Sequence, residues 1–210
     1  MRQLIQLAFI TLLASGCAGN SGDEHIESGS AFYLNGEYEK AKAELKQALD
    51  KKLIRYTQQE ACTILGNIYK ELDEYDSAIL YHKKAIRLDA TYSSAWVNLG
   101  IIYRLTSEYD SAERCYTMAN KLNPNDPELH ASLGALYIFK GDARTAIMHL
   151  EKSINLDPKL EVAHSNYALA LAMAGEFEKA EIELKKAVAL GYKDGEVIKE
   201  KIDDLKQLEE

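Results

Sequence analysis

The sequence lacks the motifs that usually carry enzymatic chemistry. It has no glycine-rich phosphate loop, no G-x-S-x-G nucleophile motif, no H-E-x-x-H zinc motif and no C-x-x-C pair. It contains only three cysteines, and its residues offer neither a nucleophile–base pair nor a set of metal ligands. We therefore expect no enzymatic activity, no cofactor and no metal site.

Positive charge is also scarce. The chain has 25 lysines and arginines against 33 aspartates and glutamates, a net charge of −8. Residues 1–16 contain one arginine and no acid, so the remainder has 24 basic and 33 acidic residues, a net charge of −9. This balance argues against nucleic acid or an anionic lipid surface as the main partner.

Long hydrophobic runs are missing except at the N-terminus. There Arg2 precedes an apolar run over residues 4–14, which is too short to span a bilayer. Ser15-Gly16-Cys17 follows, and the whole segment resembles a bacterial lipoprotein signal peptide. The resemblance implies that residues 1–16 are cleaved off and that Cys17 carries the lipid. An ordinary signal peptide and an uncleaved anchor remain alternatives.

The resemblance also implies a location. Residues 17–23 would form a short tether that holds the rest of the chain near the membrane of the cell envelope, because several acyl chains on one residue anchor stably. Ala18 follows the cysteine, where an aspartate would suggest retention in the inner membrane. We therefore expect the outer membrane, facing the periplasm, if the host is Gram-negative.

Small residues recur with a period of 34. Three further sets of residues repeat in step with them, and such a period indicates one supersecondary unit copied along an array. The four sets are Gly66, Gly100, Gly134 and Ala168; Tyr69, Tyr103, Tyr137 and Leu171; Ala78, Ala112, Ala146 and Ala180; and Ala85, Ala119, Ser153 and Ala187.

The best copy resembles a tetratricopeptide repeat (TPR). It reads Trp96-x2-Leu99-Gly100-x2-Tyr103, followed by Ala112, Tyr116, Ala119 and Pro124. The resemblance implies an all-α fold, a TPR α-solenoid of about five helix-turn-helix repeats with a C-terminal capping helix. The array would cover 24–194, with repeats at about 24–58, 59–92, 93–126, 127–160 and 161–194, and the cap would cover 195–210.

Turn and cap signals agree with these repeats. Asp126 is a predicted N-cap, with Pro127 at the first helical position. Gly36, Gly141 and Gly175 are expected in the tight turns between paired helices.

The TPR resemblance implies that the first helices of the repeats line a concave groove. Inward positions that could bind a partner helix or peptide are Asn67, Lys70, Val97, Ile101, Arg104, Leu105, Ile138, Phe139, Leu169 and Met173. We expect Ile138, Phe139 and Met173 to be the hydrophobic anchors. Alternatively, the C-terminal helix or a neighbouring molecule covers the apolar part.

Histidines and cysteines inside the array have two interpretations each. His130 and His164 occupy the fourth position of their repeats, either as a metal-binding or pH-sensing ladder or as substitutes for a packed aromatic residue. Cys62 and Cys115 lie at repeat positions that should not meet, so we expect free thiols and no disulfide.

The sequence therefore predicts a membrane-anchored interaction protein. By fold-level analogy, it would be an adaptor or assembly factor that binds a protein or peptide partner in the envelope. The alternatives are a self-associating scaffold, which would form a homo-oligomer, and a pilotin-like secretin assembly factor.

Overall fold

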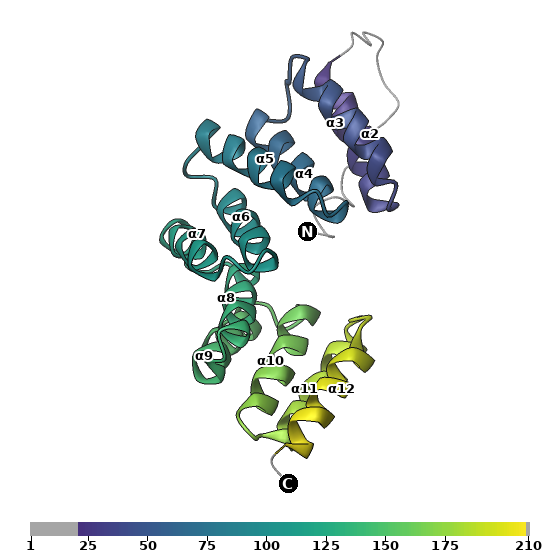
Figure 1. Ribbon diagram of the computed structural model, residues 1–210. Coiled ribbons are helices and arrows are strands. Elements are labelled where there is room, and N and C mark those ends of the chain that lie inside the picture. The colour runs from purple at the N-terminus through teal and green to yellow at the C-terminus, as the bar shows by residue number, and fades with distance from the viewer. Residues whose placement is uncertain (1–20, 209–210) are drawn as a thin grey trace. The chain divides into compact units, whose positions relative to one another are not determined.

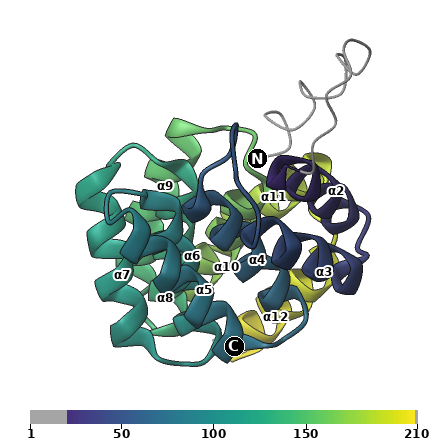
Figure 2. The ribbon, with the colours of Figure 1, turned by 90° about the horizontal axis from the view of Figure 1, so that it is seen from above.

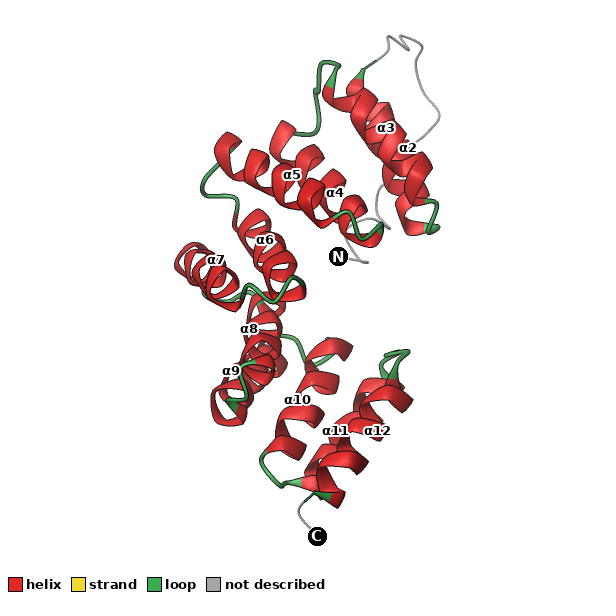
Figure 3. Ribbon diagram, viewed as in Figure 1, coloured by secondary structure: helices red, strands yellow, loops and turns green. Residues whose placement is uncertain are grey.

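The computed structural model describes residues 21–208 (Figure 3). The signal peptide predicted over 1–16 and the lipidation site Cys17 lie outside the described residues. The described part contains eleven helices and no strand, which confirms the all-α prediction. The helices are α2 (Gly22–Leu34), α3 (Tyr38–Leu49), α4 (Gln58–Glu71), α5 (Tyr75–Leu88), α6 (Ser93–Leu105), α7 (Tyr109–Leu122), α8 (Pro127–Phe139), α9 (Ala143–Leu156), α10 (Glu161–Met173), α11 (Phe177–Ala189) and α12 (Gly195–Gln207).

The chain divides into two compact units, the first ending at Thr57 and the second beginning at Gln58. In the described part of the first unit, α2 packs against α3. The carboxylate of Asp23 accepts hydrogen bonds from the backbone N–H groups of Ile54 and Arg55, each at 3.0 Å. Asp23 thereby fastens the segment after α3 onto the start of α2.

The beginning of α2 corrects the predicted tether. Residues 17–23 were expected to be a linker, but α2 already begins at Gly22, and Asp23 is only 2% exposed. The physical reason is the pair of hydrogen bonds to Asp23, together with the Gly22 N–H, which donates to the carbonyl of Lys52 at 2.9 Å. The sequence pattern of small polar residues did not show these contacts.

The second unit is an array of four helix pairs followed by α12 (Figures 1 and 2). Within each pair, a first helix (α4, α6, α8 or α10) packs against a second helix (α5, α7, α9 or α11). Each second helix also contacts the first helix of the next pair, and successive first helices contact each other. The last helix, α12, packs on α10 and α11, as expected for a cap.

The 34-residue period of glycine follows from this packing. A Cβ added to Gly66 would lie 2.6 Å from Cε1 of His82, and one added to Gly100 would lie 2.5 Å from Cε1 of Tyr116. A Cβ on Gly134 would similarly meet the side chain of Leu150. The glycines of α4, α6 and α8 therefore make room for a large buried side chain of the paired second helix, whereas α10 has Ala168 at this position.

In the turn between the two helices of each pair, one residue has a positive φ, and it always stands at the same position of the repeat. Gly141 and Gly175, in the second unit, both have φ +76°, which glycine adopts without strain. Asp73 (φ 57°) and Ser107 (φ 62°) occupy the same position in the other two pairs. All four pairs therefore have the same turn, whether or not the residue is glycine. The prediction from glycine positions found this turn in only two of the four pairs.

The predicted start of α8 is confirmed. The side chain of Asp126 accepts hydrogen bonds from the N–H groups of Glu128 at 2.9 Å and Leu129 at 3.3 Å, and Pro127 is the first residue of the helix.

Among residues 21–208, no helix combines the length and the apolar character needed to cross a bilayer.

Candidate functional site

The first helices of the second unit carry the predicted partner-binding residues. Phe139 and Leu105 are the most exposed of them, at 56% and 45%. Seven others are half-buried and therefore present part of their side chains to solvent: Asn67, Lys70, Ile101, Arg104, Ile138, Leu169 and Met173. We call the surface formed by these nine residues the first-helix face.

Val97 is a correction to the predicted set. It is 5% exposed and belongs to a core cluster with Tyr116, Leu129 and Leu133. Because α8 packs over this part of α6, the side chain of Val97 fills the space between repeats and offers almost no surface to a partner.

Phe139 and Arg104 are brought together by the packing of α6 against α8. The guanidinium carbon of Arg104 lies 5.3 Å from the centre of the Phe139 ring, within the range of a cation–π interaction. On the same ring, Tyr109 stacks with a centroid distance of 6.1 Å and an interplanar angle of 25°. The exposed Phe139 ring is thus held in place by two neighbours while keeping more than half of its surface free.

Tyr109 was missed by the sequence analysis. It is the first residue of α7 and therefore follows the turn that ends the first helix of its repeat. The signal that could have found it is an aromatic residue directly after a turn, next to a predicted groove position. Arg104, Tyr109 and Phe139 form what we call the aromatic cluster of the first-helix face.

The polar residues of α4 are separate from the aromatic cluster. Lys70 forms an ion pair with Glu71, with Nζ 2.5 Å from Oε1, so its charge is already balanced. Asn67 lies one turn earlier on the same helix. The face therefore changes along the array from a polar beginning on α4 to an aromatic and apolar surface on α6, α8 and α10.

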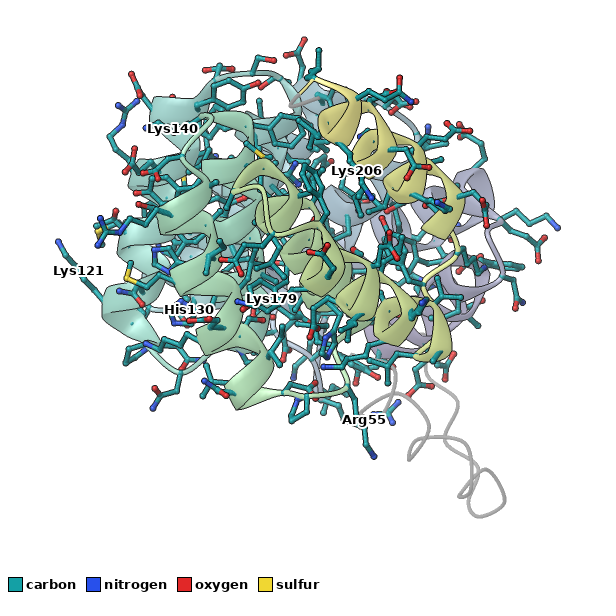
Figure 4. All side chains as sticks on the ribbon, turned by 90° about the horizontal axis from the view of Figure 1, so that it is seen from below. Arg55, Lys121, His130, Lys140, Lys179 and Lys206 are labelled. Carbon is teal, nitrogen blue, oxygen red and sulfur yellow. The ribbon has the colours of Figure 1, made fainter. Side chains whose placement is uncertain are left out.

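His130 and His164 make the same contact in neighbouring repeats. Nε2 of His130 donates to the carbonyl of Pro124 at 3.0 Å, and Nε2 of His164 is 3.1 Å from the carbonyl of Pro158. His130 lies among the helices (Figure 4), with 2% of its surface exposed. These contacts support the interpretation that the two rings fill an aromatic packing position.

Each histidine also meets a residue of its second helix 19 positions later. Nδ1 of His130 is 3.3 Å from Nδ1 of His149, and Nδ1 of His164 is 2.6 Å from Oε2 of Glu183. Burial lowers the pKa of both His130 and His149, and each ring also stacks on the other. Within residues 21–208, no three histidine, cysteine or acidic side chains are placed to hold a metal ion.

The two cysteines of the described chain are free, as predicted. Cys62 and Cys115 are both buried and form no disulfide with each other. Burial raises the pKa of the Cys115 thiol to about 11, which keeps it protonated and unreactive at neutral pH. Neither cysteine belongs to the first-helix face.

Comparison with known proteins identifies the repeats. Residues 69–136 match one tetratricopeptide repeat model and residues 127–160 match another. Comparison with curated proteins finds no match. The chain therefore carries TPR repeats, as the signature around Trp96 predicts.

Solved TPR structures are similar over most of the chain. A thermophilic TPR protein of Thermus thermophilus has a TM-score of 0.74 at 19% identity, covering 88% of this chain and 98% of the other. MamA has a TM-score of 0.59 at 25% identity, covering 80% and 91%. Pseudomonas aeruginosa PilF has a TM-score of 0.69 at 21% identity, covering 82% and 78%. These similarities confirm the TPR fold.

Proposed function

We propose that this TPR chain is a lipid-anchored, non-enzymatic adaptor of the bacterial cell envelope. It binds a helix or an extended peptide of a partner protein on the first-helix face. The single observation that carries this proposal is the aromatic cluster, in which Phe139 is 56% exposed and fixed between Arg104 and Tyr109. Exposed aromatic and arginine side chains dominate the energy of protein interfaces, so the cluster is the expected anchor point.

The surroundings of the cluster fit a peptide partner. Leu105 and Ile138 lie next to Arg104 and Phe139 in the sequence, and both keep part of their side chains exposed. An amphipathic helix could place apolar residues against these side chains at a spacing of three or four residues. The fold supports a protein-binding role in general, because repeat arrays present extended surfaces of this kind.

The membrane part of the proposal depends on Cys17 and its preceding apolar segment. The support is the sequence pattern alone, since these residues lie outside the described part of the chain. A lipid on Cys17 would hold the array at the membrane, where its partners would be other envelope proteins. This restricts the proposed partners by location without naming one.

Replacing Phe139 with aspartate is expected to abolish partner binding and leave the fold intact. The substitution removes the exposed ring and places a carboxylate in the apolar surface, and loss of such an anchor typically weakens binding by at least about 2 kcal/mol, or roughly thirtyfold. Tagged wild-type and variant proteins would be crosslinked in native cells, purified and compared by mass spectrometry. The melting temperatures of the wild type and the variant, measured by circular dichroism, should be nearly equal, which would show that the fold is intact.

Leu80→Asp is the matched control. Leu80 is also 56% exposed, but it lies on the second helix α5. We expect Leu80→Asp to capture the same partners as the wild type. Equal loss of capture in both variants, or capture that survives Phe139→Asp, would contradict the proposed site. Unfolding of Phe139→Asp would show that the ring belongs to the core.

A further inference from the structure

A hollow of about 420 Å³ lies on the other side of the array, between the second helices α5 and α7. Its walls and floor come from three consecutive helices. They are Lys83, Ile86 and Arg87 of α5, Trp96, Leu99 and Tyr103 of α6, and Ser111, Arg114, Cys115 and Met118 of α7. We call it the basic hollow.

Three cations surround the basic hollow. Lys83, Arg87 and Arg114 are all exposed, and no carboxylate within residues 21–208 lies within ion-pair distance of any of them. Arg114 donates to the hydroxyl of Ser111 at 3.0 Å, and Nζ of Lys83 lies 5.7 Å from the ring centre of Tyr103. Three unpaired positive charges at one place are unusual in a chain whose net charge is −8.

The neighbouring carboxylates on α7 do not neutralise these cations. Glu113 is bound by Lys140, with Oε2 2.7 Å from Nζ, and accepts the Tyr137 hydroxyl at 2.7 Å. Asp110 borders an adjoining hollow, which shares only Arg114 and Met118 with the basic one. The positive field of the hollow therefore remains available to an outside group.

The interior of the hollow is apolar and aromatic. Trp96 and Tyr103 are half-buried, and the indole N–H of Trp96 donates to the carbonyl of Ala90 at 3.0 Å, which fixes the ring. Leu99, 3% exposed, closes the floor. A hollow of this volume has space for one large side chain, and the aromatic walls favour an aromatic or aliphatic one.

Equivalent positions in the later repeats show that helix packing does not require three cations here. At the interface between the next two pairs, the positions equivalent to Lys83, Arg87 and Arg114 hold Thr117, Lys121 and Met148. At the interface after that, they hold Glu151, Asn155 and Ile182. Because the same helix packing forms with one cation at these positions or with none, stacking of the repeats does not account for all three cations.

We propose that the basic hollow binds an acidic peptide segment of a partner protein. One aromatic or aliphatic side chain of the peptide would enter between Trp96 and Tyr103, and flanking carboxylates would lie against Lys83, Arg87 and Arg114. Arginine binds carboxylates through two parallel hydrogen bonds, which gives such a contact both strength and geometry. This site is distinct from the first-helix face and needs neither Phe139 nor Cys17.

The test is a selection of peptides from a library of random 12-residue sequences displayed on phage, using the purified full chain as bait. The selected sequences should contain an aromatic or aliphatic residue flanked by aspartate or glutamate. A synthetic copy of the strongest one should lose at least about tenfold in affinity when Lys83, Arg87 and Arg114 are all changed to glutamate. Its binding should also weaken as salt is raised.

The matched control changes Arg144, Lys152 and Lys185 to glutamate. These residues are exposed on α9 and α11, and none of them lines the basic hollow or the hollow beside it. The control has the same net charge as the test variant, so it should keep affinity within about twofold of the wild type, as should Phe139→Asp. If the triple glutamate variant does not fold, Lys83→Gln/Arg114→Gln replaces it, with an expected loss of at least about threefold.

Four results would overturn the proposal. Selected peptides could lack acidic residues, or the control could lose as much affinity as the test variant, which would indicate attraction by net charge alone. The third is a hollow occupied by a second copy of the chain, detected as a dimer that the triple glutamate variant abolishes. Loss of peptide binding in Phe139→Asp alone would instead assign the peptide to the first-helix face.

Discussion

Replacing His82 with leucine should remove a large part of the protein's sensitivity to acid. His82 is fully buried in α5, under Gly66, and neither of its ring nitrogens has a hydrogen-bond partner. Burial, helped by the nearby charge of Lys70, lowers its pKa from 6.5 to about 3. The folded chain therefore keeps the ring neutral at pH values where the unfolded chain already protonates it.

The sign of the effect follows from this difference in pKa. The contribution of His82 to stability is complete above about pH 6.5 and is lost progressively as the pH falls toward about 3. The loss is about 1.4 kcal/mol per pH unit, or about 3 kcal/mol at pH 4. Leucine has no proton to bind, and it already fills the equivalent position as Leu150 and Leu184.

Urea unfolding at pH 7.5, 5.5 and 4.0 would measure this effect. The free energy of unfolding of wild type should fall more steeply with acid than that of His82→Leu, with a gap that widens by about 3 kcal/mol between pH 7.5 and 4. The variant should also be at least as stable at pH 7.5, because leucine leaves no buried polar atom unpaired. If the free energy of unfolding depended on pH equally in the two proteins, His82 would not be taking up a proton on unfolding.

Replacing Gly100 with alanine should destabilise the array by about 1–3 kcal/mol, although alanine is the better helix former by about 1 kcal/mol. The added Cβ would lie 2.5 Å from Cε1 and 2.7 Å from Cδ1 of Tyr116, whose ring is fully buried and cannot turn aside. Steric overlap should therefore outweigh helix propensity. Urea unfolding followed by circular dichroism would measure the change.

A double variant separates this overlap from a general effect of alanine. Gly100→Ala/Tyr116→Leu reproduces the pair that the last repeat uses, Ala168 and Leu184, which share one core cluster. In the Tyr116→Leu background, the alanine should cost less than in the wild type, because the last repeat accommodates the same alanine–leucine pair, and the cycle should show a coupling of about 1 kcal/mol. A Gly100→Ala protein as stable as the wild type would contradict the explanation of the glycine period.

The helix pairs and most of their turns could be predicted from the sequence because the same residue types recur at a fixed period. A glycine, an alanine or a turn that recurs every 34 residues can be recognised without knowing what it contacts, and the cap at Asp126 is a local signal. The partners of those residues were not predictable in the same way. His130 and His149 are 19 residues apart on different helices, and only the packing of α8 on α9 shows that their rings meet.

The candidate site shows the same limit more strongly. Repeat positions identified Phe139 and Arg104 separately, but their contact and the stacking of Tyr109 depend on the angle at which α6, α7 and α8 pack. Val97 was assigned to the binding face by its position, yet it is buried because the neighbouring repeat covers it. The basic hollow escaped the sequence analysis because its three cations come from two different repeats.

The most direct test of a membrane-tethered adaptor compares wild type with Cys17→Ser in native cells. Both proteins would be crosslinked, the membranes separated from the soluble fraction, and the co-purifying proteins identified by mass spectrometry. We expect wild type in the membrane fraction together with an envelope protein, and Cys17→Ser in the soluble fraction without that partner. Two soluble proteins that capture only their own chain would contradict the account and favour a self-associating scaffold.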